Sequence, residues 1–406
     1  MGPASSGTPL GYTGAGMQMG VNNFNIGAPF FNYDPSVSGY INQPPVPSQQ
    51  QVMAVNSILE STPPETALSE DKRQQLVELI EGDFNDSSAP VKSRDELFDG
   101  NKADESHVLS LQMMQTYIGS YWMHFHPQIP ILHKPSFSPN MCPDLMLIAM
   151  MALGASCLEK TYGYAVTQNC AEFANFIAWH LRWKIFMDAD FRPPAKLWIF
   201  QTLLLLEMYE KMYSTRPLHE RAHIHHATTL TLMRRGSSLI GRSSVDSPPS
   251  VKGDRHNSNG SIVNMSGTNT PDDWWNNWIS NEATRRAAFA AFLMDSIHAT
   301  MFGHSAVMVA HEMRLPLPCD ESLWVATSGA DVGRFEQQMH QQGIKPTTFL
   351  DGLKKTLNGQ SVRTNSFGRT IIMAGLLSVS WHMNQRDLQV SSLGVSQALG
   401  GRDKWR

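Results

Sequence analysis

Residues 117–137 read YIGSYWMHFHPQIPILHKPSF, in which an aromatic-rich stretch runs directly into a proline-rich one. Apolar residues recur every three or four positions from Leu111 to Phe125, a spacing that predicts an amphipathic helix entering this stretch. Proline has no backbone N–H and keeps the residue before it out of the helical conformation. The prolines should therefore end the helix and impose an extended segment, whose Ile131, Leu132 and Phe137 would pack onto a core.

The same helical spacing returns along much of the chain. Helices are expected over about 69–82, 143–153, 173–181, 195–213, 217–235, 281–302 and 369–386, with a separate helical stretch at Trp274, Trp275 and Trp278. Ser69 is placed to cap the first of these helices, and Pro143 is expected in the first turn of the next. No long segment alternates with a period of two, so no strand is predicted. The expected fold class is all-α, with many helices.

Composition divides the chain into segments. Residues 1–67 contain no Lys, Arg or His and are rich in Gly, Pro, Ser, Asn and Gln. Such a composition cannot bury enough apolar surface to offset chain entropy, so a disordered tail is predicted. A short helix and linker over 68–105 would lead into a helical domain over 106–406. The Ser-, Gly- and Asn-rich stretch 237–273 is predicted to be a disordered insert in that domain.

Charge and cysteine content exclude several classes of protein. The 406 residues carry a net charge of −4 and no long basic run, whereas direct binding to nucleic acid requires clustered Lys and Arg. No apolar run reaches the length of a membrane helix, so no membrane partner is predicted, and the first residues lack the parts of a secretory signal. The four cysteines include no C-x-x-C pair, which favours buried reduced thiols over a structural zinc site. They are Cys142, Cys157, Cys170 and Cys319.

The opening stretch resembles a known sequence signature. It is similar to the start of the fungal transcription-factor regulatory ("middle homology") domain, where an aromatic helix is followed by F-H-P-x-x-P-I-L-H-x-P-[ST]-F. The matching positions here are Tyr121 in the aromatic helix and then Phe125, His126, Pro127, Pro130, Ile131, Leu132, His133, Pro135, Ser136 and Phe137. We expect the two histidines to bond backbone groups rather than to do chemistry.

Two further stretches resemble the same family, in the same order. Residues 281–295, NEATRRAAFAAFLMD, are similar to its E-x-x-R-R…F…D helix, and residues 315–324, LPLPCDESLW, to its following segment. The matching residues are Glu282, Arg285, Arg286, Phe292 and Asp295 in the helix, and Pro318 and Trp324 in the segment after it. Glu282 and Arg286 lie four residues apart on one helix face, which permits an ion pair. We expect Asp295 to be a structural partner rather than a catalytic acid.

The resemblance implies a function. It covers about residues 109–324 and implies a nuclear protein that regulates transcription by RNA polymerase II, most similar to the subgroup preceded by paired Cys-Cys-His-His zinc fingers. The 406 residues contain no finger, so DNA would be contacted through a finger module not present here, and zinc is expected only there. No cofactor is expected in this chain. Transcription coregulators are the expected protein partners, and a homodimer stays open.

Two alternatives remain at this point. The first is a finger-less coregulator that acts only through protein contacts. The second is a zinc hydrolase, because His219, Glu220 and His223 match H-E-x-x-H, in which both histidines bind zinc and the glutamate is the general base. A catalytic zinc needs a third protein ligand, and His226 and Thr229 stand where the extended metzincin pattern has Gly and His. No catalytic residue is therefore predicted. Target genes, the sign of regulation and any effector are not indicated by the sequence.

Overall fold

The computed structural model describes residues 67–85, 92–235 and 271–392. All of them belong to one unit of the chain, residues 47–406. The predicted disordered tail lies outside the described residues except for Ala67, and the predicted insert does so except for residues 271–273. Those three residues form the start of a helix.

The fold class is all-α, as predicted. No strand forms within the described ranges, where the one β-type contact is an isolated bridge between Pro316 and Thr348. The helices are α2 (Glu70–Asp83), α3 (Arg94–Leu97), α4 (Leu111–Ser120), α5 (Asp144–Cys157), α6 (Glu159–Tyr162), α7 (Tyr164–Met187), α8 (Leu197–Met212), α9 (Arg216–Arg235), α10 (Pro271–Phe302), α11 (Glu321–Trp324), α12 (Gly329–Gln341), α13 (Phe349–Leu357) and α14 (Ser366–Ser392). Among these described helices, none is both long and apolar enough to cross a membrane.

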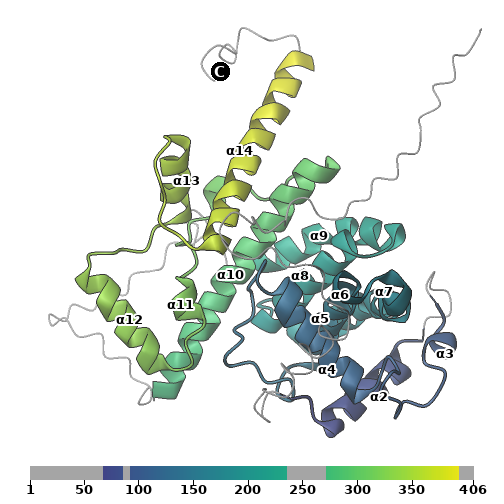
Figure 1. Cartoon of the computed structure of the whole chain (residues 1–406). Helices are drawn as coiled ribbons and strands as arrows, with labels where there is room; N and C mark the ends of the chain where they lie inside the picture. The colour runs from purple at the N-terminus through teal and green to yellow at the C-terminus, as the bar shows by residue number, and fades with distance from the viewer. Residues whose placement is uncertain (1–66, 86–91, 236–270, 393–406) are drawn as a thin grey trace, which may run out of the picture. The chain divides into compact units, whose positions relative to one another are not determined.

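Helix α5 forms the centre of the core. Its sequence, DLMLIAMMALGASC, is apolar on every side, and a helix of that kind must be covered all round. Helices α4, α7 and α8 pack against it (Figure 1). Gly154 permits the close approach of α4, because a Cβ at this position would lie 1.8 Å from the carbonyl oxygen of Tyr117. Ser120 Oγ then donates to the Gly154 carbonyl at 2.8 Å, which fixes the two helices together.

The proline-rich stretch behaves as the sequence predicts, with one addition. After α4 the helix widens into a π-helical turn, Tyr121–Phe125, in which the backbone N–H of His126 donates to the Tyr121 carbonyl at 2.9 Å. The chain then leaves the helix, and Ile131 and Leu132 are 1% and 3% exposed. The extended segment is therefore anchored in the core directly after the aromatic helix.

Some boundaries differ from the predicted ones. Pro143 is the N-cap of α5, not a residue of its first turn. The three tryptophans and the following stretch form one helix, α10, because no proline or glycine interrupts the chain between residues 274 and 302. Helices α12 and α13 were not predicted. Helix α12 is largely polar and buries only Val332, and α13 is nine residues long, so neither has a long apolar stripe.

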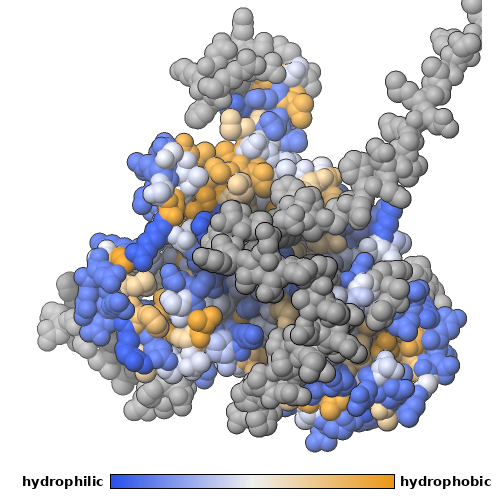
Figure 2. Space-filling model, viewed as in Figure 1, coloured by the Kyte–Doolittle hydropathy of each residue, from blue (hydrophilic) through white to orange (hydrophobic). Residues whose placement is uncertain are grey.

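A small second core lies apart from the main one. Leu323, Ala326 and Val332 are buried together, and the helices that carry or flank them, α10, α11 and α12, pack against one another. Trp275 and Trp278 cover this cluster from α10, with their rings stacked at 5.5 Å. Elsewhere, Figure 2 shows hydrophobic residues gathered over α13 and the adjoining part of α14.

Candidate functional site

Arg286 is the residue on which the three sequence motifs converge. It lies on α10 with none of its surface exposed, and its Nε donates to Glu282 Oε1 at 2.9 Å. This is the ion pair that the four-residue spacing permits. Arg285 contacts the other carboxylate oxygen of Glu282, but its side chain is 29% exposed. Glu282 is thus shared by a buried and a partly solvated arginine.

The guanidinium of Arg286 also reaches the other two motifs. It donates to the carbonyl of Pro130 in the first motif at 3.4 Å and to the carbonyl of Cys319 in the third at 3.2 Å. Its carbon lies 4.4 Å from the centroid of the Trp324 ring, a cation–π contact. A buried charge is tolerated only when it is paired and hydrogen-bonded, and this one has a carboxylate, two carbonyls and an aromatic face. Arg286 therefore ties together segments that are 156 and 33 residues away in sequence.

His133 completes the contact between the first and third motifs. Its ring meets the Trp324 ring edge-on at 4.8 Å and the Trp275 ring at 5.5 Å. Its Nδ1 bonds to Ser136 Oγ at 2.7 Å, a side chain of the motif itself, and the backbone of Trp324 and Ala326 also interacts with the ring, as expected for this histidine. Burial lowers the pKa of His133 to about 4, which keeps the ring neutral at neutral pH.

His126 is not among the groups that Arg286 contacts directly, although the charge of Arg286 acts on its ring. Nδ1 of this ring is buried and has no hydrogen-bond partner among the described residues, so the expected backbone bond is not made there. Its ring packs edge-on against Trp122 at 4.6 Å, and burial lowers its pKa to about 3. A neutral imidazole in this setting acts as a packing group.

The remaining residues of the first motif are divided between core and surface. Tyr121 and Phe125 are buried, with ring centroids 5.5 Å apart, and Phe137 packs edge-on against Trp122 at 5.1 Å. Pro127 and Pro135 are exposed, whereas Pro130 is buried beneath Arg286. In the third motif, Pro318 is buried next to Cys319. The aromatic positions thus hold the helix in the core, and the junction uses Pro130 and His133.

Asp295 serves a different part of the molecule. It lies nine residues beyond Arg286 on α10 and is 2% exposed. Its carboxylate accepts the backbone N–H groups of Val307 at 3.0 Å and Met308 at 2.7 Å, and lies 3.0 Å from His226 Nε2. It therefore fixes the segment that follows α10, a structural role.

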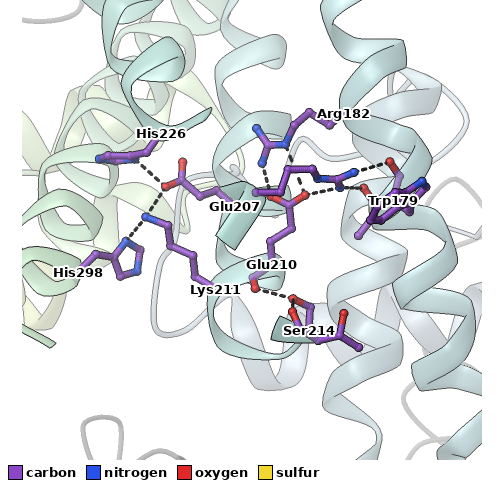
Figure 3. A network of polar contacts seen from close by, with 11 residues as sticks. Trp179, Arg182, Glu207, Glu210, Lys211, Ser214, His226 and His298 are labelled. Atoms are coloured by element: carbon purple, nitrogen blue, oxygen red, sulfur yellow. Dashed lines mark hydrogen bonds and ion pairs between the residues drawn. The ribbon is translucent and has the colours of Figure 1, made fainter. Parts of the chain in front are cut away.

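A second set of buried charges, which the sequence analysis missed, surrounds α8 (Figure 3). Glu210 is fully buried and accepts from the guanidinium groups of Arg182 on α7 and Arg221 on α9, the latter at 2.6 Å. Figure 3 shows Glu207 directed to the other side of α8, toward His226 and Lys211. A signal was present in the sequence, since two glutamates and a lysine occur in a helix whose other residues are mostly apolar.

The Glu207 side of this network holds a charged histidine. Nδ1 of His226 lies 2.6 Å from Glu207 Oε1, an ion-pair distance without the angles of a hydrogen bond. Burial acts to lower the pKa of His226, but Glu207 and Asp295 outweigh it and raise the pKa to about 9. Lys211 lies 2.9 Å from Glu207 and 2.7 Å from Nδ1 of His298. Burial and the nearby Lys211 lower the pKa of His298, so the two histidines carry different charges at neutral pH.

The H-E-x-x-H motif does not form a metal centre in the described part of the chain. Nδ1 of His219 bonds to the Lys211 carbonyl at 3.1 Å, and the ring of His223 stacks on that of His304 at 3.3 Å. Glu220 is exposed and pairs with Arg216 at 2.8 Å. No group of three His, Cys, Asp or Glu side chains placed to hold a metal ion occurs among the described residues. The four cysteines, all described, form no disulfide.

Comparisons with known proteins agree with the three motifs. The sequence model of the family described as "Fungal specific transcription factor domain" matches residues 118–406. The chain is 29% identical over 276 residues to "Zinc finger protein klf1" of Schizosaccharomyces pombe, a match covering 68% of this chain and 32% of that protein. It is 28% identical over 335 residues to the "Nicotinate catabolism cluster-specific transcription factor" of Emericella nidulans, covering 81% of this chain and 34% of that protein.

A third relative supports the same assignment. "Zinc finger protein zas1" of Schizosaccharomyces pombe is 25% identical over 285 residues, which are 69% of this chain and 29% of that protein. The chain therefore spans about a third of the length of the curated relatives it matches. No solved structure matches it.

Proposed function

The chain belongs to the fungal-specific transcription factor domain family, and from this premise we propose that its helical domain, residues 106–406, regulates transcription by RNA polymerase II. In this proposal it is the regulatory domain of a zinc-finger type DNA-binding transcription factor. It acts in the nucleus and by a non-catalytic mechanism, in which the domain receives a partner or signal and passes it to the DNA-binding module.

The observation that carries the proposal is the Arg286 junction. One buried side chain contacts all three motif segments, and the family match includes every residue of this junction. In some proteins a buried ion pair ensures that the chain segments around it adopt one arrangement only. We propose that Arg286 has this role here. The motif residues would then preserve the shape of a regulatory surface and perform no reaction.

DNA contact is assigned to a zinc-finger module that the 406 residues do not contain. Two of the relatives carry "zinc finger protein" in their names, and this chain has a net charge of −4 without a basic run. Sequence-specific binding needs a recognition element and phosphate contacts, and neither is evident here. We propose coregulator proteins as the partners of the helical domain itself.

A reporter assay tests the proposed function. The 406-residue chain is fused to a heterologous DNA-binding domain and assayed on a promoter that carries the matching site. The fusion should change reporter output relative to the DNA-binding domain alone, and Arg286→Ala should diminish that change more than Arg285→Ala. A folded fusion, checked by circular dichroism, that leaves the reporter unchanged contradicts the proposal. Sequencing the transcript upstream of Met1 separates the factor from a finger-less coregulator.

A further inference from the structure

A cavity of about 390 Å³ lies beside the Arg286 junction. Its walls come from α10, from the third motif segment, from α12 and from the loops on either side of α13 (Figure 1). Pockets that hold small organic molecules have volumes of roughly 300–1,000 Å³, so this one is large enough for a small ligand. It is also where three separate stretches of chain meet.

The carboxylates that line the cavity are already engaged. Glu282 is shared by the two arginines of α10. The side chain of Asp320 caps α11. Glu336 accepts from Trp278 Nε1 at 3.4 Å. The charge of Glu282 is therefore compensated by its arginines, whereas Asp320 and Glu336 have hydrogen-bond donors but no ion pair among the described residues.

Of the three cationic side chains that line the cavity, one is paired and two have no partner among the described residues. Arg285 is paired with Glu282, but Lys345 and Arg363 form no ion pair or side-chain hydrogen bond within the part of the chain that the structure describes. Lys345 lies in the loop before α13 and Arg363 in the loop after it. Two such positive charges on one cavity favour the binding of an anion. An arginine side chain can bind a carboxylate through two parallel hydrogen bonds.

The rest of the lining is suited to an apolar group. Met339 and Ile344 line the cavity together with Leu323 and three prolines. Binding sites of this kind combine an apolar wall with a few polar groups that fix orientation. The apolar wall is formed by Met339 of α12 and Leu323 of α11 together with Ile344 and the prolines of the loops, and Lys345 and Arg363 lie in the loops on either side of α13.

We propose that this cavity binds a small carboxylate with an apolar body. Arg363 and Lys345 hold the carboxylate, and the apolar body lies against Met339 and Ile344. Such a ligand joins the two loops that flank α13 to the junction on α10. The inference concerns binding alone and does not depend on the chain regulating transcription.

Ligand binding by the purified full-length chain tests the proposal. Phenylacetate is titrated and followed by saturation-transfer NMR, with its neutral amide, phenylacetamide, as the matched probe, and acetate and octanoate as acids of other sizes. Phenylacetate is expected to bind with a dissociation constant in the millimolar range or tighter, and phenylacetamide at least about tenfold more weakly, because the amide has no negative charge for Arg363 and Lys345. Arg363→Gln and Lys345→Gln should each weaken phenylacetate binding by a similar factor.

A control variant separates the site from general charge. Arg369 is exposed on α14 and does not line the cavity, so Arg369→Gln should leave phenylacetate binding unchanged. The melting temperature without ligand confirms that each variant is folded. The proposal is overturned if none of the three acids binds at roughly 10 mM, if the amide binds as well as the acid, or if the Arg369 variant loses as much affinity as the Arg363 variant.

Discussion

Two sets of buried charges lie in this domain, and they are built in different ways. At the junction, the charge of Arg286 is satisfied by one carboxylate of its own helix, two backbone carbonyls and the Trp324 ring. Around α8, Glu210 is satisfied by Arg182 and Arg221 from two other helices, and Glu207 by His226 from α9 together with Lys211 of its own helix (Figure 3). The first arrangement depends on local spacing and backbone position, and the second on how four helices pack.

The difference has consequences for stability. Removing one partner of a buried ion pair is costly because the other charge is left without compensation. Arg182 has no exposed surface and depends on Glu210 for its charge, whereas Glu282 would keep Arg285 if Arg286 were lost. The α8 network should therefore be the more sensitive of the two sets.

The largest effect is expected from Glu210→Ala. This substitution leaves Arg182 and Arg221 in the core without their carboxylate, although Arg221 keeps the carbonyls of Ala178 and Trp179. The free energy of unfolding should fall by about 3–5 kcal/mol, measured by urea denaturation. The control is Glu220→Ala, which removes an exposed pair with Arg216 and should leave stability nearly unchanged. Equal losses from the two variants would show that burial does not distinguish these glutamates.

A smaller but still large effect is expected at the junction. Arg286→Ala removes the contacts to Pro130, Cys319 and Trp324 but leaves Glu282 paired with Arg285, so the loss should be about 3 kcal/mol, the lower end for a buried pair. Arg285→Ala removes a partly solvated charge and should cost less than about 1 kcal/mol. Thermal and urea unfolding of the two variants give the comparison. If Arg285→Ala is the more damaging, the assignment of Arg286 as the central residue is wrong.

The two regions also differ in how far the sequence predicts them. The Glu282–Arg286 pair follows from a four-residue spacing, and the all-α class from helical periodicity, because both are local properties. The partners of Glu210 are 28 and 11 residues away, and those of Lys211 include His298, 87 residues away, so no local pattern indicates them. The contact of His133 with Trp324 is likewise set by packing. The motifs predicted which residues matter at the junction, but not that Arg286 touches all three segments.

The pH dependence of stability should distinguish the two regions, because His226 of the α8 network changes its charge between neutral pH and pH 9. His226 faces Glu207 and Asp295, with Lys211 and His298 nearby, and these carboxylates raise its pKa from 6.5 to about 9 against the effect of burial. The folded protein binds this proton more tightly than the unfolded chain, so its contribution is complete below about pH 6.5 and is lost as the pH rises through 9. The loss should be about 2–3 kcal/mol between these values. His298, whose pKa is lowered, acts in the opposite sense and destabilises the fold only as the pH falls below about 6.5.

Urea denaturation at several values between pH 6.5 and 9 measures this effect. His226→Gln keeps a polar side chain at the site but has no titrating group, so the decline in stability toward pH 9 should become shallower than in the unsubstituted protein. Arg286→Ala should keep the decline, since the junction does not contact His226. A decline of the same slope in the His226 variant would assign it to other groups.

The smallest expected effect is the interaction energy between substitutions in the two regions, which should be close to zero. A double-mutant cycle measures it. Helix α10 carries a residue of each region, Arg286 at the junction and Asp295 beside His226. Nine residues of helix separate them by about 13 Å, and they share no partner, so their substitutions should add. The losses from Arg286→Ala and Asp295→Asn should therefore sum to that of the double variant within about 0.5 kcal/mol. A larger interaction energy would mean that α10 responds as a rigid unit and passes a change at the junction to the α8 network. Additivity would instead mean that a ligand or partner at the junction can act on its own surroundings without weakening the core around α8.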